Sequence, residues 1–244
     1  MRLKRGVQIL TTQVPLERGR LFFVTMVPTT KLRVWRTRLM GQKVRIIVGA
    51  DTHISYPGWI DTWRDTLDIA RGFYWRFYFP PGSVDNVLVE HVLEHIEPAE
   101  LPAVFRNIHT ALRVGGVFRV AVPDGYHPSG FFKEFSRPGG WGAGADDHKT
   151  FFTVDMMREL AQTYGFECVP VEYFDRSGTF HTRPMSDEHG TIKRTARKWI
   201  PELEAYLTPA QRAEFFDTIP APLRAQFTQS GMLFTSLWVD FVKK

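Results

Sequence analysis

Apolar and polar positions change in blocks along the chain, and the clearest series of blocks lies between residues 81 and 124. Residues 87–89 form a continuous apolar run, which predicts a buried strand. Apolar positions at helical spacing follow over residues 101–112, and two glycines at 115–116 are expected to end that helix. Residues 117–122 are again mostly apolar. A strand, a helix and a strand in this order predict a parallel pair joined by a right-handed crossover.

The same pattern predicts further elements on both sides of this unit. Residues 44–48 are β-branched and mostly apolar, which favours a first strand, and residues 58–63 favour a second. Residues 153–164 have helical spacing between a threonine cap and a terminating glycine. Two more strands are expected over residues 166–174 and 233–242.

Composition limits the class of protein. The chain has 244 residues, of which 43% are hydrophobic, so it can bury one sizeable core, and we expect one main domain. The single cysteine, Cys168, excludes an intrachain disulfide framework and a multi-cysteine metal site. No segment approaches the roughly 18 apolar residues that a membrane helix needs, and no signal-peptide pattern is found. We therefore expect a cytoplasmic protein.

Positive charge is concentrated at the start of the chain. Residues 1–45 carry eleven Lys or Arg and a single acid, whereas the remainder is net acidic. Such an arm indicates an anionic partner, for example nucleic acid, a membrane surface or a phosphorylated substrate. The alternative is a solubilising extension, in which a helix over residues 31–40 buries Leu32, Trp35 and Leu39.

The order of these blocks divides the chain into four parts. We expect a basic N-terminal extension (1–43), a core (44–180), a helical insertion or cap (181–231) and the last strand of the core (232–244). Within the insertion, four prolines break the helical pattern of residues 192–230. Such an excursion between two strands is suited to covering a substrate pocket or to forming an oligomer contact.

Polar segments follow the predicted parallel strands. Loops at the carboxyl ends of such strands form the ligand crevice, so residues 90–91 and 124–127 should face the same side. Gly49, Ala50 and Asp51 follow the first strand, where a nucleotide loop would lie. The Gly-x-Gly-x-x-Gly pattern of a dinucleotide loop is absent, whereas an adenosyl ligand without phosphates needs fewer backbone donors.

Three carboxylates lie close to the end of the second predicted strand. Asp61, Asp65 and Asp68 can accept hydrogen bonds from ribose hydroxyls or from an adenine amino group. For each of them, a helix cap or a turn is an equally good interpretation.

Three histidines are candidate general bases, because each lies in a polar loop expected near the crevice. They are His91, His127 and His148, and a structural hydrogen-bonding role is the alternative for each. Residues 146–148 also carry two aspartates beside His148, which could hold a divalent ion, but further ligands are missing and we assign no metal site.

A competing pattern lies in the elbow after residue 90. His91, Glu94 and His95 match the His-x-x-Glu-His pattern of inverted zinc peptidases, in which two histidines on one helix bind zinc beside a general-base glutamate. The motif directly follows a strand and is closed by Pro98, so a long helix carrying both histidines is not indicated.

Several segments together resemble class I S-adenosylmethionine-dependent methyltransferases in their order and spacing. They are residues 48–50, 57–60, 67–69, 89–95, 112–116 and 120–125. Residues 125–128, 137–140, 144–149 and 234–240 are similar to a poorly characterised bacterial group of predicted methyltransferases. The resemblance spans roughly residues 44–244 and leaves the basic arm outside.

The resemblance implies a Rossmann-like doubly wound α/β sheet, mostly parallel with an antiparallel last strand, and S-adenosylmethionine as cofactor. It places Gly49 and Ala50 near the methionine moiety, with Asp51 where a second glycine is common. Asp68 and Ile69 would border the adenine.

Two further positions follow from the resemblance. Glu90 and His91 would lie beside the sulfonium. The acid that grips the ribose would fall near Trp63, with Asp61 or Asp65 as its substitute.

We therefore expect an S-adenosylmethionine-dependent methyltransferase that acts on a small-molecule or glycan-like acceptor. Methyl transfer from a sulfonium is an in-line displacement, so positioning and water exclusion matter most. A base is needed only when the acceptor must lose a proton. The alternatives are a catalytically silent binding protein of the same fold and, third, a zinc hydrolase that uses His91, Glu94 and His95.

Overall fold

The computed structural model describes residues 29–49, 56–142, 144–184, 186–195 and 235–244. Predicted features at residues 1–28, at Ala50 and Asp51, and over residues 196–234 lie outside these ranges. Among the described residues, no helix has the length and apolar character needed to cross a membrane.

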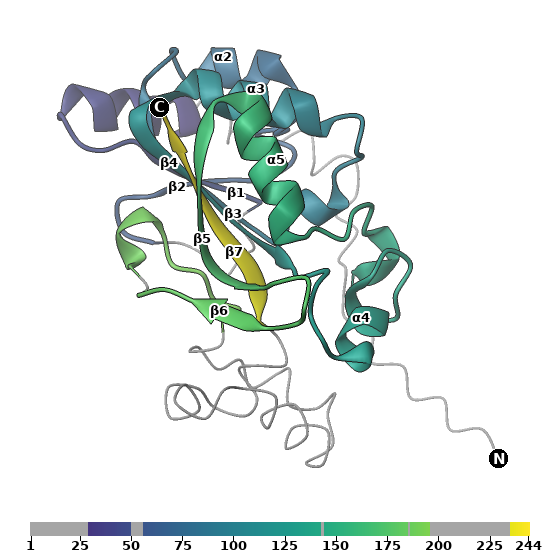
Figure 1. Ribbon diagram of the computed structural model, residues 1–244. Helices are drawn as coiled ribbons and strands as arrows, with labels where there is room; N and C mark the ends of the chain where they lie inside the picture. The colour runs from purple at the N-terminus through teal and green to yellow at the C-terminus, as the bar shows by residue number, and fades with distance from the viewer. Residues whose placement is uncertain (1–28, 50–55, 143, 185, 196–234) are drawn as a thin grey trace.

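A seven-stranded sheet with the order β2-β1-β3-β4-β7-β5-β6 forms the centre of the protein (Figure 1). Its strands are β1 (Arg45–Val48), β2 (Ile60–Thr62), β3 (Val84–Glu90), β4 (Leu112–Pro123), β5 (Phe166–Phe174), β6 (Phe180–Thr182) and β7 (Ser236–Lys243). The pairs β1–β2, β1–β3 and β3–β4 are parallel. The last strand, β7, lies antiparallel between β4 and β5, and β6 pairs antiparallel with the edge of β5. The predicted Rossmann-like class with an antiparallel last strand is confirmed.

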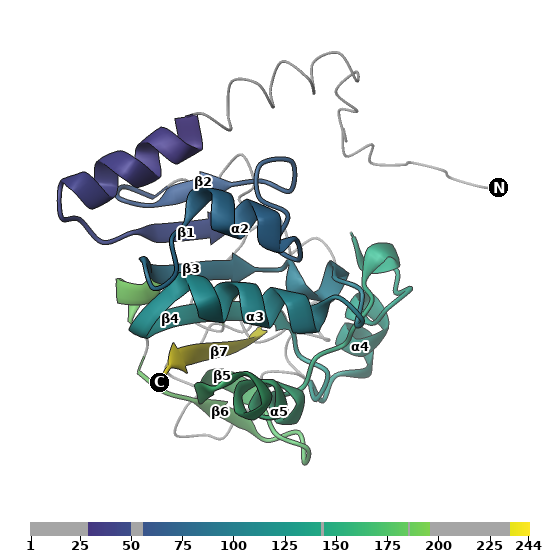
Figure 2. The ribbon, with the colours of Figure 1, turned by 90° about the horizontal axis from the view of Figure 1, so that it is seen from above.

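Three helices cover one face of the sheet (Figure 2). They are α2 (Gly72–Tyr78), α3 (Leu101–Ala111) and α5 (Val154–Tyr164), and α4 (Gly130–Ser136) lies beyond the sheet. Short 3₁₀ turns are η1 (Leu93–His95), η2 (Ala145–Asp147) and η3 (Asp187–His189). The caps of α5 are as predicted, because the Thr153 hydroxyl accepts a hydrogen bond from the Met156 amide and Gly165 adopts a φ of 76°.

Two apolar clusters lie on the two faces of the sheet, since side chains alternate along each strand. The larger cluster joins Trp75, Phe105 and Met157 of the helices to strand residues such as Val89. The smaller cluster, on the opposite face, contains Ile47, Leu88 and Trp238. This alternation decides which polar residues at the strand ends can face the helices.

The end of α3 differs from the prediction. The helix ends at Ala111 and β4 begins at once with Leu112, so Gly115 and Gly116 lie inside the strand. Gly115 has a φ of 71°, and the register between β3 and β4 shifts between Val84 and Asn86. The glycines therefore accommodate an irregularity in the strand instead of ending the helix.

The helix over residues 29–39 also packs differently from the prediction. Leu32, Trp35 and Leu39 are 60%, 59% and 70% exposed, so the proposed buried stripe is wrong. The opposite face is buried instead: Val34 joins the main core, and the Arg33 guanidinium donates to the Trp59 carbonyl at 2.8 Å. An apolar stripe shows that a helix is amphipathic, but not which neighbour is present to cover it.

Candidate active site

A cavity of about 380 Å³ opens at the carboxyl ends of β1 and β3. Its apolar lining consists of Val48, Gly49, Leu67, Ile69, Val92 and Ile96. Its polar lining consists of Arg64, Asp68, Arg71, His95, Glu97, Glu100, Asp147 and Lys149. We call this cavity the strand-end pocket. Open α/β sheets bind their ligands at this end of the strands.

Gly49 forms one wall of the strand-end pocket and cannot be replaced without strain. Its φ is 69°, a conformation that favours glycine, and an added Cβ would lie 2.5 Å from Cγ2 of Val92. The chain leaving β1 therefore turns sharply against the chain leaving β3. Ala50 and Asp51, predicted beside Gly49, lie outside the described residues.

Asp68 and Ile69 line the same pocket. One carboxylate oxygen of Asp68 accepts a hydrogen bond from the Ala70 amide at 3.0 Å, which holds the turn, while the other lies 3.8 Å from Nε of Arg71. The Ile69 carbonyl accepts a hydrogen bond from the Trp75 indole at 2.9 Å. The structure thus brings Gly49, Asp68 and Ile69 together, as the resemblance implied for a cofactor site.

Three other predicted cofactor residues face the opposite side of the sheet. Asp61 pairs in register with Ile47, and Trp63 packs against the smaller core. Glu90 lies two positions after Leu88 in β3 and therefore on the same face, and one of its carboxylate oxygens accepts hydrogen bonds from the backbone amides of residues 193 and 194 at 2.8 and 3.0 Å. Asp61, Trp63 and Glu90 do not line the strand-end pocket. The predicted substitute Asp65 does not line it either.

His91 occupies a strained position directly after β3, with a φ of 54°. Its Nδ1 lies 2.9 Å from a carboxylate oxygen of Glu94, and its Nε2 lies 2.9 Å from the Ser236 hydroxyl. Burial, followed by the charge of Arg194, holds the pKa of His91 well below its ordinary value. The imidazole is therefore neutral at neutral pH and links η1 to β7.

Glu94 is fully buried in η1. Burial raises the pKa of its carboxyl group to about 7. The oxygen that does not contact His91 has no hydrogen-bond partner among the described residues. The backbone carbonyl of Glu94 accepts from the Lys149 amide at 2.6 Å, which ties η1 to the segment after η2.

The other two candidate histidines have different surroundings. His127 is fully buried between the rings of Phe132 and Phe174, at centroid distances of 4.0 and 4.7 Å, and its Nδ1 accepts a hydrogen bond from the Ser129 amide. This arrangement fits the structural alternative. His148 is partly exposed, and its Nδ1 lies 2.7 Å from the Ser136 carbonyl.

The zinc-peptidase pattern is not carried on a long helix. His91 precedes η1, which is three residues long and ends at His95. Both ring nitrogens of His91 have hydrogen-bond partners, and one of these is Glu94, the residue that the pattern needs as a base. The expectation that the context of the motif opposes a zinc hydrolase agrees with this geometry.

Sequence reasoning missed several pocket residues. Val92 contacts the Gly49 turn, and Arg64 and Lys149 supply positive charge to the wall. Asp147 and His95 line the pocket together, with their side chains 3.5 Å apart. The elbow after residue 90 and the loop at residues 146–148 were both expected near the crevice. The sequence therefore predicted where these side chains lie, but not what they do.

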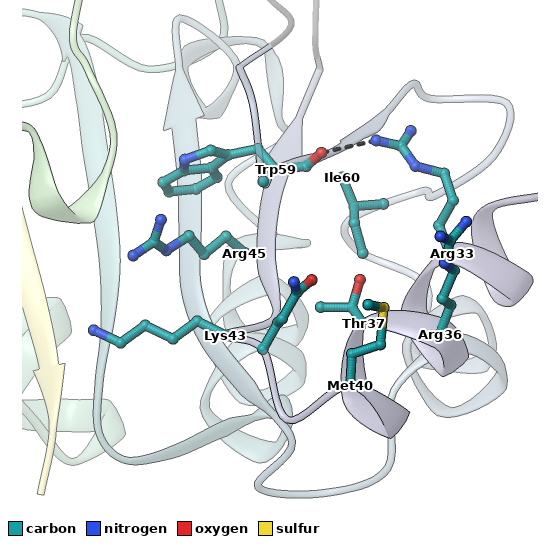
Figure 3. Close-up of a pocket in the computed structure, with 10 residues that line it drawn as sticks. Arg33, Arg36, Thr37, Met40, Lys43, Arg45, Trp59 and Ile60 are labelled. Atoms are coloured by element: carbon teal, nitrogen blue, oxygen red, sulfur yellow. Dashed lines mark hydrogen bonds between the residues drawn. The ribbon is translucent and has the colours of Figure 1, made fainter.

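A second concavity, of about 580 Å³, lies at the amino ends of β1 and β2 (Figure 3). Four of its lining residues are cationic, namely Arg33, Arg36, Lys43 and Arg45. We call it the basic pocket. It lies at the opposite end of the strands from the strand-end pocket, because Arg45 begins β1 and Gly49 follows its last residue.

Comparison with known proteins gives a family-model match in the central segment of the chain. Residues 63–120 match a family model described as a methyltransferase domain. The matched segment contains α2, β3, η1, α3 and most of β4. No curated protein sequence matches the chain.

Several solved structures are similar to the chain at low sequence identity. A SAM-dependent methyltransferase from Archaeoglobus fulgidus is 11% identical, over 88% of this chain and 94% of that chain, with a TM-score of 0.44. A putative Haloferax volcanii methyltransferase, solved with its activator, is 13% identical over 87% and 77%, with a TM-score of 0.40. Phosphoethanolamine N-methyltransferase 2 of Haemonchus contortus, in complex with S-adenosyl-L-methionine, is 14% identical over 88% and 52%, with a TM-score of 0.36.

Proposed function

We propose that this chain is an S-adenosylmethionine-dependent methyltransferase of class I and that the strand-end pocket is its cofactor site. We further propose that the acceptor is a small molecule or a glycan-like group. The observation that carries the first proposal is the joint position of Gly49, Asp68 and Ile69 at the carboxyl ends of β1 and β3.

The residues of the strand-end pocket fit this cofactor chemically. Its volume of about 380 Å³ lies within the usual range of small-molecule sites. Leu67, Ile69 and Val92 offer an apolar surface for a purine ring. The Asp68 oxygen that lies 3.8 Å from Nε of Arg71 can accept hydrogen bonds from the ligand. Lys149, whose ammonium pairs with Asp147 at 3.1 Å and Glu97 at 3.7 Å, would supply a cation for the carboxylate of the cofactor. A phosphate-binding loop is not required.

The cofactor supplies an activated methyl group, and the protein's contribution is to orient both reactants and to exclude water. Gly49 lets the backbone approach the ligand closely, and Asp68 fixes the orientation of the bound group. Charged side chains at the wall, such as Glu97 and Asp147, suit a polar, hydroxylated acceptor.

If the acceptor must lose a proton, His91 and His148 are the proposed bases. His91 is suited to the task because its lowered pKa keeps the ring unprotonated, although the Ser236 hydroxyl must first leave its Nε2. His148 is more exposed. His127, enclosed by aromatic rings, is proposed for structure alone.

The cofactor site is tested by calorimetric titration with S-adenosylmethionine and S-adenosylhomocysteine. We expect micromolar binding to the wild-type protein, at least about 100-fold weaker binding to Gly49→Ala, and about tenfold weaker binding to Asp68→Ala. The matched control is Gly82→Ala, because Gly82 has the same left-handed φ but no atom within 4 Å of an added Cβ. Absence of binding by folded wild-type protein would reject the proposed site.

The basic pocket suggests a separate role. We propose that Arg33, Arg36, Lys43 and Arg45 bind an anionic group of a partner, away from the site of methyl transfer. We also propose the division of the chain into a basic extension, a core, an insertion and a last strand. In this division, the extension contributes to binding of the partner.

A further inference from the structure

A cluster of metal-binding side chains lies beside the strand-end pocket, and one of its members, His148, is also a base proposed above. Glu94, His95 and His148 each offer one donor atom, and these three atoms lie within 4.8 Å of one another. The part of the chain that the structure describes contains this one group of three such side chains close enough to share an ion.

Glu94 is the first reason to expect a cation there. Its side chain is fully buried, and one oxygen is occupied by His91 at 2.9 Å. The second oxygen is buried and has no partner among the described residues. A buried carboxylate oxygen without a partner costs free energy, and a bound cation would supply the missing interaction.

The two histidines are held in the form that binds metal ions. Because the Ser136 carbonyl can only accept, Nδ1 of His148 carries the proton at 2.7 Å from it, and Nε2 keeps a lone pair. Nδ1 of His95 similarly faces the Asp147 carboxylate at 3.5 Å. A carbonyl or carboxylate on the remote ring nitrogen is the usual outer partner of a metal-ligating histidine.

Backbone contacts hold the ligands near one another although they come from two distant segments. The carbonyl of Glu94 accepts hydrogen bonds from the Lys149 and Thr150 amides at 2.6 and 3.3 Å. The rings of His95 and His148 meet edge to face with centroids 4.7 Å apart. Main-chain hydrogen bonds therefore hold the two segments together, with the two histidine rings in contact.

We propose that Glu94, His95 and His148 bind one divalent transition-metal ion. Two imidazoles and one carboxylate form a donor set that suits Zn²⁺ and leaves a coordination position open. Ligand atoms at about 2.0–2.2 Å from zinc lie roughly 3.3 Å apart, so the donors must move closer than in this structure. Rotation of the partly exposed His95 and His148 rings supplies that movement.

This ligand set differs from the zinc-peptidase interpretation of the same motif. There, His91 and His95 would be ligands and Glu94 a base, whereas here Glu94 is a ligand and His91 positions it. Since His95 lines the strand-end pocket, the ion would lie at the edge of that pocket, where its role would be to polarise an oxygen of the acceptor. That role rests on the proposed methyl transfer, but binding of the ion does not.

The test is a metal titration of chelator-treated, tag-free protein. We expect one Zn²⁺ per chain by calorimetry and one Co²⁺ per chain by its visible absorption. His95→Ala and His148→Ala should each weaken binding by at least about 100-fold. His181→Ala is the matched control, because His181 also pairs with a carboxylate, that of Asp175, outside the cluster. Since no methyl donor is used, the result is independent of the cofactor assignment.

Two outcomes would overturn the proposal. One is a failure of the ligand set: either the wild-type protein binds no stoichiometric ion, or the His95→Ala and His148→Ala variants bind the ion as tightly as the His181→Ala control. The other is a loss of binding in His91→Ala with no loss in His148→Ala, which would support the zinc-peptidase ligand set instead. Both histidine ligands are partly exposed, so their variants should fold, and circular dichroism checks this.

Discussion

Asp124, the residue that directly follows β4, shows how strongly a single environment can change an ionisable group. The side chain is fully buried, and its two oxygens accept hydrogen bonds from the Tyr126 and Phe174 amides at 2.9 and 2.7 Å. Burial outweighs these two donors and raises the pKa of the carboxyl group from 3.8 to about 7. The residue therefore anchors β5 to the end of β4 while it titrates near neutral pH.

The raised pKa of Asp124 predicts a loss of stability with rising pH. Between pH 4 and 7 the folded state binds more protons at Asp124 than the unfolded state, so the free energy of unfolding falls as pH rises and becomes level above about pH 7. We expect this side chain to account for a fall of roughly 2–4 kcal/mol. Urea unfolding of the wild type and Asp124→Asn at pH 5 and pH 8 measures it.

The variant itself provides the comparison, because asparagine does not titrate. The difference in unfolding free energy between wild type and Asp124→Asn should change between the two pH values. A difference that stays constant would contradict a raised pKa, whatever the other titrating groups contribute.

The sequence predicted some site residues and not others, for a reason that operates at single positions. Gly49, Asp68 and Ile69 lie in turns after strands, where the topology alone brings them to the pocket. Asp61 and Glu90 lie within strands, where a shift of one position moves a side chain to the other face. Because the sequence does not give the strand register, it could not predict on which face of the sheet Asp61 and Glu90 lie.

At the scale of elements, a buried ion pair joins β4, β7 and the η3 segment. Arg119 and Asp240 stand opposite each other in the antiparallel pair and form two hydrogen bonds at 2.8 and 2.7 Å. The same guanidinium donates to the carbonyls of Ser186, at 2.6 Å, and of Gly190. Arg119 therefore holds the η3 segment against the sheet.

This arrangement predicts an asymmetric response to mutation. Arg119→Met should lower the free energy of unfolding by about 3–5 kcal/mol, because it leaves the Asp240 carboxylate buried without its partner. The double variant Arg119→Met with Asp240→Leu should recover a large part of that loss. Urea unfolding of the three proteins measures both effects.

A surface pair supplies the control for the same experiment. Arg113 and Asp85 are 2.7 Å apart, but the Arg113 side chain is half exposed. Arg113→Met should therefore cost no more than about 1 kcal/mol. If Arg113→Met and Arg119→Met lower the free energy of unfolding equally, burial of the Arg119–Asp240 pair does not add to the cost of losing its arginine.

Element boundaries were less predictable than element types. The helices α3 and α5 and the first and last strands, β1 and β7, follow the hydrophobic pattern of the sequence. The end of α3 was misplaced, because Leu112 continues the helical spacing while its backbone already belongs to β4. Tertiary pairing with Val84 decided that position, and a single sequence carries no record of it.

At the scale of the whole molecule, the parallel strands separate two pockets. The order of strand, helix and strand fixes which end of the sheet carries loops with ligand-binding potential, and the strand-end pocket lies there as expected. The basic pocket at the other end was not predicted in position, although the charge of the arm was. Its shape depends on how the helix over residues 29–39 packs beside β2, which the periodicity assigned to the wrong face.

The separation of the two pockets predicts that anion binding and cofactor binding are independent. Arg36→Glu with Lys43→Glu removes two cations from the basic pocket and leaves the strand-end pocket untouched. Calorimetry with inorganic pyrophosphate at low salt should show at least about tenfold weaker binding by this variant, while its affinity for S-adenosylmethionine stays at the wild-type value. Arg106→Glu with Arg183→Glu is the control, since both side chains are exposed and lie outside either pocket, and the change in net charge is the same. If the two double variants lose pyrophosphate binding equally, the anion responds to the net charge of the chain and the basic pocket is not a site.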